Sequence, residues 1–245
     1  MVCCWRWCRL KSRNRPLSSY RYYCSEGNMQ KNDTKVMVNR EFYLQSAHIV
    51  APALLGKLLV HHSAEGMTSG IIVEVEAYIG PTDKASHSYQ NKRTKRTEIQ
   101  FGIGGFAYIY SIYGIHSCFN VVVNYENKPE VVLVRALEPV GGIELMQQRR
   151  LCKSTIDLCN GPGRLCQAMG ITKAQYGYDL CVDSLYIESQ PSLPDSNIQI
   201  SPRINIDYAA ECKDYLWRYY IKDSLYVSKV AKRYTLQQQE YTQEY

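Results

Sequence analysis

The stretch "IIVEVEAYIG", residues 71–80, has the alternation of a β-strand, and the interpretation of the whole sequence depends on it. Side chains of a strand point to its two faces in turn. One face is purely apolar and is expected in the core: Ile71, Val73, Val75 and Ala77. The other face carries Ile72, Glu74, Glu76 and Tyr78. A strand with the composition of a buried strand therefore places two carboxylates beside the core.

Two interpretations of Glu74 and Glu76 are open. Acidic side chains on a strand usually mark a solvated face. Here Val and Ile dominate the strand, Tyr78 continues the acidic face, and His87 follows in the next loop. A carboxylate in a partly dry cleft is a good general base. The second acid would then orient the first or pair with an arginine, for which Arg135 in "VVLVRALEP" (131–139) is the candidate.

The composition is that of a globular protein. The 245 residues are 45% hydrophobic and 21% charged, enough for one large domain or two small ones. No apolar run approaches the ~20 residues of a membrane helix, so no membrane association is expected. Tyrosine is unusually frequent, with 21 residues against 4 Phe. Tyrosines fill cores, but they also stack on flat ligands while keeping a polar tip.

The net charge of +6 comes from the first forty residues. Nine Lys and Arg against Glu26 and Asp33 give +7 there and leave −1 in the remainder, so only local clusters could favour nucleic acid. This leader lacks the apolar stretch of a signal peptide. It is either an organelle transit sequence or the result of a start codon placed too far upstream, with Met29 or Met37 as the real start. We expect a disordered or mis-assigned leader at 1–39, one domain at 40–235 and a polar tail at 236–245.

The ten cysteines do not predict a disulfide scaffold. Four lie in the leader, and six are spread among expected helices and strands. Cys152, Cys159 and Cys166 are seven residues apart, which is not a common zinc spacing. We expect reduced cysteines, a cytosolic protein, and neither metal nor cofactor.

The remaining pattern predicts an α+β domain with a curved antiparallel sheet and surrounding helices. A helix ending near Gly56 precedes a strand, and a polar loop (80–98) follows the strand 71–79. Three strands are expected within 106–139, helices at 141–150 and 161–171, loops over 172–215, and a closing strand pair within 216–230.

The segment "FAYIYSIYGIHSCFN" (106–120) predicts a tyrosine-rich hairpin. Tyr108 and Tyr110 share one face of its first strand, and Tyr113 lies at the tip beside Gly114. A tyrosine at a tip is often simply exposed. Alternatively it is a wedge, because proteins that unstack DNA insert bulky side chains between bases.

A basic cluster lies between the acidic strand and the hairpin: Lys92, Arg93, Lys95 and Arg96. It is either a solvated loop or a set of phosphate contacts. The stretch "NGPGRL" (160–165) opens a helix whose N–H groups could meet a phosphate, although a plain turn is the safer interpretation.

Five motifs together resemble the alkyladenine (3-methyladenine) DNA glycosylase family: "LLGKLLV", "VEVEAYIGPTDKASHS", "YIYSIYGIHSCFNVV", "VLVRALEP" and "GPGRLCQAMGI". The resemblance runs from about residue 54 to 230. It implies a monofunctional enzyme of base excision repair with a protruding DNA-inserting hairpin. Such an enzyme removes 3-methyladenine, 7-methylguanine, hypoxanthine or ethenoadenine, flipped out of duplex DNA, and leaves an abasic site.

The resemblance also implies roles for single residues. Glu76 is similar to the general base that activates water, and Arg135 to a second holder of that water. The walls of the base pocket would be Tyr78, His87 and Tyr110.

Further roles concern selection and DNA contact. Asn120 is similar to the residue that rejects guanine by its exocyclic amine, and Tyr113 to the residue that fills the gap left by the flipped nucleotide. Contacts to the DNA backbone would come from Arg93, Lys95 and Arg96.

Three positions depart from the family pattern. Thr97 stands where the family usually has Asn, "QFGIGG" (100–105) replaces a stretch with Met-Phe and Pro-Pro-Gly, and Asp223 replaces a Gly. These changes touch loops and the DNA side and leave the catalytic set intact.

Two other functions remain as alternatives. A non-catalytic module, like the C-terminal tRNA-binding domain of formyltransferases, would not need Glu76, Arg135 and Asn120 together. A nucleoside hydrolase would not need Tyr113 or the basic cluster. The expected partner is duplex DNA with damaged purines, bound by a monomer. Its location would be cytoplasmic, nucleoid-associated in a bacterium, or nuclear or organellar in a eukaryote.

Overall fold

The computed structural model describes residues 36–112, 114, 116–182 and 184–228. Its strands are β1 (Leu58–Ser63), β2 (Gly66–Tyr78), β3 (Ala107–Ile112), β4 (His116–Val123), β5 (Glu130–Gly141), β6 (Leu185–Glu188), β7 (Ile198–Ser201) and β8 (Arg218–Ile221). Its α-helices are α1 (Arg40–Tyr43), α2 (Ala47–Leu54), α3 (Ile143–Arg150) and α4 (Pro162–Met169). Short 3-10 helices complete the set: η1 (Gly80–Thr82), η2 (Tyr89–Asn91), η3 (Glu98–Phe101), η4 (Lys173–Gln175), η5 (Asp195–Asn197) and η6 (Asp207–Asp214).

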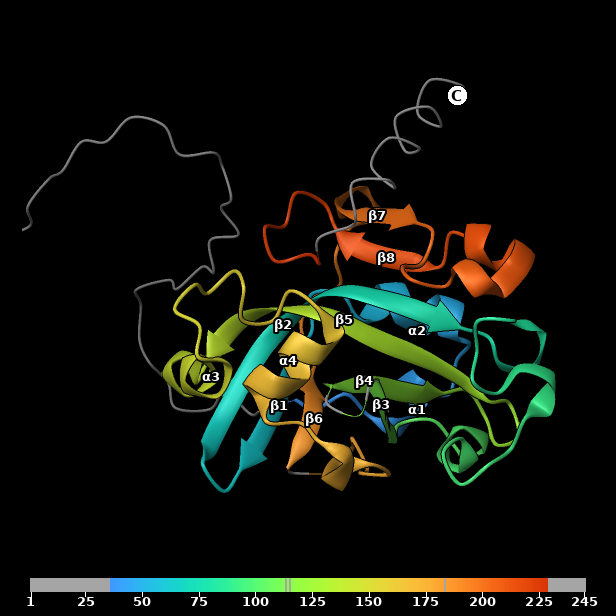
Figure 1. The fold of residues 1–245 in the computed structure, drawn as a ribbon, viewed down its shortest axis with the longest axis horizontal. Helices are drawn as coiled ribbons and strands as arrows, with labels where there is room; N and C mark the ends of the chain where they lie inside the picture. Colours follow the sequence, from blue (N-terminus) through green and yellow to red (C-terminus); the bar gives the residue numbers. More distant parts are fainter. Residues whose placement is uncertain (1–35, 113, 115, 183, 229–245) are drawn as a thin grey trace, which may run out of the picture. The chain divides into compact units, whose positions relative to one another are not determined.

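All the strands join one curved antiparallel sheet in the order β3-β4-β5-β2-β1-β6, and β8 pairs with both β2 and β7. Figure 1 shows the long strands β2 and β5 crossing the middle of the fold, with β7 and β8 on one side and β3 and β4 on the other. The predicted α+β class, the single domain and the curved antiparallel sheet are confirmed.

Strand β2 is the most enclosed element of the sheet. It pairs with β5 along one edge, while β1 takes the first half of its other edge and β8 takes the part around Glu74 and Glu76. Both carboxylates are therefore 0% exposed. The solvated-face interpretation is wrong, because the sequence of β2 does not show that β8 returns from far along the chain to cover this edge.

Register shifts interrupt the pairing of β2 with β5 at the acids. Pairing passes from Glu74 with Ala136 to Val75 with Val134, which leaves Arg135 without a residue directly opposite. When a residue is skipped in strand pairing, its side chain points in a different direction from those of its neighbours. The shift accordingly lets the Arg135 side chain reach both acids of β2.

The helices begin and end at the expected signals. Helix α2 contains Pro52 in its second turn, and the chain turns at Gly56 (φ +81°) before β1. Helix α4 begins with Pro162 and ends at Gly170 (φ +70°), where a left-handed residue closes the last turn. Helix α2 packs on β2 and β5, and α4 packs on β4 and β5, which places the apolar core between helices and sheet.

The C-terminal third differs from the expectation. The segment 172–215 contains β6, which pairs with β1, and β7, which pairs with β8. The predicted closing pair within 216–230 is wrong in its described part, since 216–228 holds only β8 and its partners are β7 and β2. Strands of four residues are too short to show a period of two, so their pairing partners define them.

The tyrosine hairpin is formed by β3 and β4, which pair from Ala107–Val121 to Ile112–His116. Gly114 at the tip has φ +73°, a conformation that favours glycine. Tyr113, the expected wedge, lies outside the described residues, as does Ile115. Among the residues described, no helix combines the length and apolar character needed to cross a membrane.

We expect a chain shortened to Met37–Tyr245 to fold. Val38 N–H still donates to Ile187 O (2.9 Å), and among the hydrogen bonds of the described residues the cut removes that from Ser189 N–H to Val36 O (2.7 Å). One backbone hydrogen bond contributes about 1 kcal/mol, so the Tm should fall by about 2–4 °C at most. Thermal unfolding followed by circular dichroism measures this, with a chain beginning at Met29 as the control. A much larger drop would show that residues 1–36 stabilise the domain.

Candidate active site

Glu74 is the structural centre of the buried acid pair. Its Oε1 accepts from Arg135 Nε (3.0 Å), Arg218 Nε (2.7 Å) and Ser228 Oγ (2.8 Å), and its Oε2 accepts from Ser228 N–H (2.6 Å). A carboxylate has about four acceptor positions. Among the described residues Glu74 receives four donors, three on Oε1 and one on Oε2, and so ties β2, β5, β8 and the segment after β8 together.

Glu76 has a different set of partners. Its Oε2 accepts from Tyr78 Oη (2.8 Å) and Arg135 Nη1 (3.2 Å), and its Oε1 accepts from Ile204 N–H (2.8 Å). Among the described residues these donors fill three of about four acceptor positions. Glu76 thus keeps one position on Oε1 at which a water molecule could donate.

The charges of the pair are set by opposing effects. Burial raises the pKa of Glu74, but Arg135, Arg218 and the Ser228 amide outweigh it and hold the pKa below its usual value. Burial lowers the pKa of Arg135, and the two carboxylates more than reverse this. Burial, followed by the nearby Glu76 charge, raises the pKa of Tyr78 well above normal. Glu74 is therefore ionised, Arg135 is charged, and Tyr78 is a neutral donor at neutral pH.

A small cavity lies next to this network. Its lining comprises Tyr78, Ala85, Ser86, His87, Gln100, Tyr108, Tyr110, Asn120, Val131 and Tyr208. The structure therefore gathers all the residues expected as pocket walls. The cavity has a volume of about 40 Å³, room for no more than a few water molecules. Glu76 is not part of its lining and contacts it through the hydroxyl of Tyr78.

His87 is held as a neutral imidazole. Burial, with Arg96 and Lys92 nearby, lowers its pKa to about 4. Arg96 Nη2 lies 2.9 Å from Nε2 and can only donate, so Nε2 accepts. The proton is then on Nδ1, which lies 2.8 Å from Tyr108 Oη. His87 thus offers a fixed edge, 4.6 Å from the Tyr110 ring centroid, across the physiological pH range.

Asn120 is fixed by its amide hydrogens. It is 2% exposed, and Nδ2 donates to Tyr108 O (3.0 Å) and Cys118 O (3.4 Å). Both carbonyls belong to the paired strands β3 and β4, so the side chain has a defined place in the cavity wall. A rigid amide at this place restricts the size of what enters.

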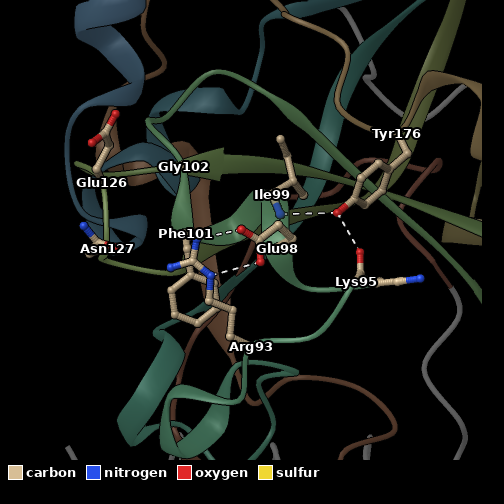
Figure 2. A pocket seen from close by; sticks show the side chains of 9 residues that line it. All are labelled: Arg93, Lys95, Glu98, Ile99, Phe101, Gly102, Glu126, Asn127 and Tyr176. Atoms are coloured by element: carbon tan, nitrogen blue, oxygen red, sulfur yellow. Dashed lines mark hydrogen bonds and ion pairs between the residues drawn. The ribbon is translucent and has the colours of Figure 1, made fainter.

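The residues of the basic cluster make different contacts. Figure 2 shows Arg93 turned toward Glu98, to which it donates two hydrogen bonds (2.9 and 2.6 Å), while the ammonium end of Lys95 points away from that pair. They line an open depression of about 600 Å³ beside Tyr176. Arg96 instead lies over the Tyr110 ring, 4.9 Å from its centroid. Only Arg96 thus connects the cluster to the cavity.

Several site residues were not anticipated from the sequence. The amide of Ile204 and the side chains of Arg203, Arg218 and Ser228 contact the acids or their neighbours. A backbone amide has no side-chain signature, and isolated arginines in a loop-rich segment resemble surface residues. Within the described ranges, no cluster of three His, Cys, Asp or Glu side chains could hold a metal ion.

Comparisons with known proteins agree with this geometry. The sequence model of the methylpurine-DNA glycosylase (MPG) family matches residues 41–225. A protein of Desulfitobacterium hafniense (strain Y51), named "Putative 3-methyladenine DNA glycosylase", is 50% identical over 201 residues, which are 78% of this chain and 98% of that protein. Proteins of the same name from Clostridium novyi (strain NT) and Bacillus mycoides (strain KBAB4) are 48% and 49% identical, over 78% and 77% of this chain and 98% and 97% of their own lengths.

The fold, the site and these relatives define a DNA N-glycosylase, a hydrolase whose substrate is DNA. The chain belongs to the methylpurine-DNA glycosylase family, and its activity is of the 3-methyladenine type.

The family departures have visible structural roles. Thr97 is 3% exposed, and its hydroxyl donates to Lys92 O (2.9 Å) and accepts from Thr94 N–H (2.9 Å), which closes the basic loop. Asp223 has φ +59°, a left-handed conformation in which the usual glycine would be unstrained. Both changes are accommodated away from Glu76.

We predict that Glu74→Gln is strongly destabilising. It leaves two buried guanidinium groups without their shared charge, and breaking a buried pair costs about 3–5 kcal/mol. Because the folded-state pKa of Glu74 is depressed, its contribution is present above the unfolded value and is lost as pH falls through the folded value. The difference in unfolding free energy between wild type and variant should therefore shrink in acid.

The matched control is Glu98→Gln, which breaks the exposed pair with Arg93 and should change stability little. Denaturant unfolding at several pH values measures both variants. Equal effects for the two would contradict the structural role of Glu74.

Proposed function

We propose that this protein hydrolyses the N-glycosidic bond of alkylated or deaminated purines in duplex DNA and leaves an abasic site. The observation that carries the proposal is the contrast between the two acids. Among the described residues Glu74 receives four donors, two of them from arginines, whereas Glu76 receives three and contacts, through the hydroxyl of Tyr78, a cavity walled by tyrosines and a histidine. That arrangement suits a water-activating base next to a pocket for a flat ring.

In the proposed reaction, Glu76 Oε1 accepts a proton from a water molecule. The water oxygen forms a bond to the sugar C1′, the C1′–N bond breaks, and its electron pair leaves with the purine. Arg135 Nη1 donates to Glu76 Oε2 (3.2 Å), holds the carboxylate in place and orients the water. A cationic alkylpurine leaves as a neutral base, whereas hypoxanthine must gain a proton to leave.

The substrate base has to leave the helix before this step, at a cost of a few kcal/mol. We propose that Tyr113 fills the vacated space, where stacking on bases contributes about 1–3 kcal/mol. The cavity, at about 40 Å³, must also widen to admit a purine. The side chains best placed to move are those at its exposed border, Arg96 and Tyr208.

We propose that Arg93, Lys95 and Arg96 contact the DNA backbone. Arg96 has a second consequence in this arrangement, because a phosphate that draws its guanidinium away also uncovers the Tyr110 ring. Backbone contact and opening of the pocket would then be coupled. We further propose a monomer that acts in the cytoplasm, at the nucleoid where the host is bacterial.

Selection among purines is proposed to rest on shape more than on charge. A cationic alkylpurine is attracted to an aromatic face. Here Arg203 already lies over Tyr78 (4.6 Å) and Arg96 over Tyr110 (4.9 Å). Those guanidinium groups reduce the attraction for a positively charged base, so neutral lesions such as hypoxanthine and ethenoadenine should also be accepted.

Asn120→Ser should relax discrimination against guanine. The fixed amide blocks the exocyclic amine, and the shorter serine leaves room for it. Release of guanine and N-alkylguanine should rise relative to adenine-type lesions, as measured by single-turnover excision from matched duplexes. An unchanged ratio would make Asn120 a purely structural residue.

Glu76→Gln is the decisive test of the mechanism. Glutamine keeps the shape but cannot accept the proton, and loss of a general base costs about 10²–10⁴-fold in rate. Affinity for damaged duplex should survive, because the cavity and the basic cluster are untouched.

Single-turnover excision and duplex binding are measured together, with Glu65→Gln, which breaks the pair with Arg149, as the matched control. Near wild-type excision by Glu76→Gln would show that another group is the base. Binding to duplex without release of any purine by the wild type would favour the non-catalytic module, and release from free nucleosides would favour the nucleoside hydrolase.

A further inference from the structure

The side chain of Arg203 makes several buried contacts behind the site, and the proposed chemical step does not use it. It is 2% exposed, and its partner Asp83 is 0% exposed. Nη1 and Nη2 donate to the two oxygens of Asp83 at 2.5 and 2.8 Å. The same nitrogens also donate to Ala77 O (3.0 Å) and Cys212 O (3.1 Å). One guanidinium therefore links β2, the loop after it and η6.

The contacts of Arg203 converge on Glu76 from two directions. Its guanidinium lies 4.6 Å from the Tyr78 ring centroid, and the hydroxyl of Tyr78 donates to Glu76 Oε2. The next residue, Ile204, donates its amide to Oε1. The carbonyl of Ala77, which Arg203 binds, lies between Glu76 and Tyr78 in the sequence. Two of the three donors to Glu76 thus depend on where Arg203 is held.

Asp83 extends this arrangement to the wall of the cavity. Besides Arg203 it accepts from the amides of Ile79 (3.3 Å) and Ala85 (3.0 Å), which shapes the loop after β2. That loop supplies Ala85 and His87 to the cavity lining. A buried pair made only for stability would not need to contact both the carboxylate donors and the cavity loop.

We propose that Arg203 and Asp83 form a positioning pair that holds Tyr78 Oη and the Ile204 amide on Glu76 and leaves the remaining position of Oε1 open for water. The pair itself does not touch the substrate. This inference rests on the proposed function and adds to it the residues that orient the base.

The proposal predicts that a change at Arg203 lowers the excision rate without weakening the binding of damaged duplex. In Arg203→Lys the charge is kept, but an ammonium cannot span Asp83, Ala77 O and Cys212 O together. Displacing catalytic groups by about 1 Å costs on the order of 10²-fold. The saturating single-turnover rate should fall about 10- to 100-fold, while affinity for damaged duplex stays within about threefold.

The matched control is Arg40→Lys. Arg40 has the same kinds of partner away from the site, namely Asp179 (2.5 Å), Gly104 O (2.8 Å) and the Phe106 ring (4.7 Å). It should leave the rate and the affinity for damaged duplex unchanged. Asp83→Asn, which keeps the shape of the partner, should reproduce the effects of Arg203→Lys.

Hydrogen exchange of the Ile204 amide, measured without DNA, tests the positioning independently of activity. Exchange should be faster in Arg203→Lys and Asp83→Asn and unchanged in Arg40→Lys. Unaltered exchange, a rate loss matched by lost affinity, or failure of both variants to fold would overturn the proposal. A wild-type protein that releases no purine would contradict the proposed function instead.

Discussion

Arg135 between Glu74 and Glu76 is the interaction on which the rest of the site depends. Two carboxylates that are 0% exposed on one strand would repel each other and lose their hydration. One guanidinium from β5 bridges them, and Arg218 from β8 adds a second charge to Glu74. The four charges balance, which allows the pair to remain ionised inside the sheet. The register shift at Arg135 makes this bridge possible.

The network gives two chemically identical side chains different sets of hydrogen-bond donors. Glu74 receives two guanidinium nitrogens, a hydroxyl and an amide, and so serves to hold strands together. Glu76 receives one guanidinium nitrogen, a phenol and an amide, and keeps some acceptor capacity. The two acids thus differ in the number and kind of their donors, while burial is the same for both.

The cavity beside Glu76 is lined by neutral side chains that are held in fixed positions. His87 is kept neutral by burial and by Arg96, Tyr78 is kept protonated by burial and by Glu76, and Asn120 is held by two backbone carbonyls. Such groups present shape and hydrogen-bonding edges without adding charge.

The sequence by itself determined the elements with strong periodic or turn signals and the residues that carry the chemistry. The alternation of 71–78, the three strands within 106–139 and the glycine-bounded helix α4 follow from local preferences, and the motifs around Glu76, Arg135 and Asn120 indicated the family. Only the tertiary structure decided which acid is structural. The acids of β2 bind groups more than a hundred residues away in the sequence, namely Arg218, Ser228 and the Ile204 amide. The local sequence of β2 does not predict these contacts. The same holds for β6 and β7, whose four residues become strands because β1 and β8, far away in the sequence, pair with them. Local sequence fixes what a segment is able to form, whereas burial and hydrogen-bond partners come from chain segments that fold back over it.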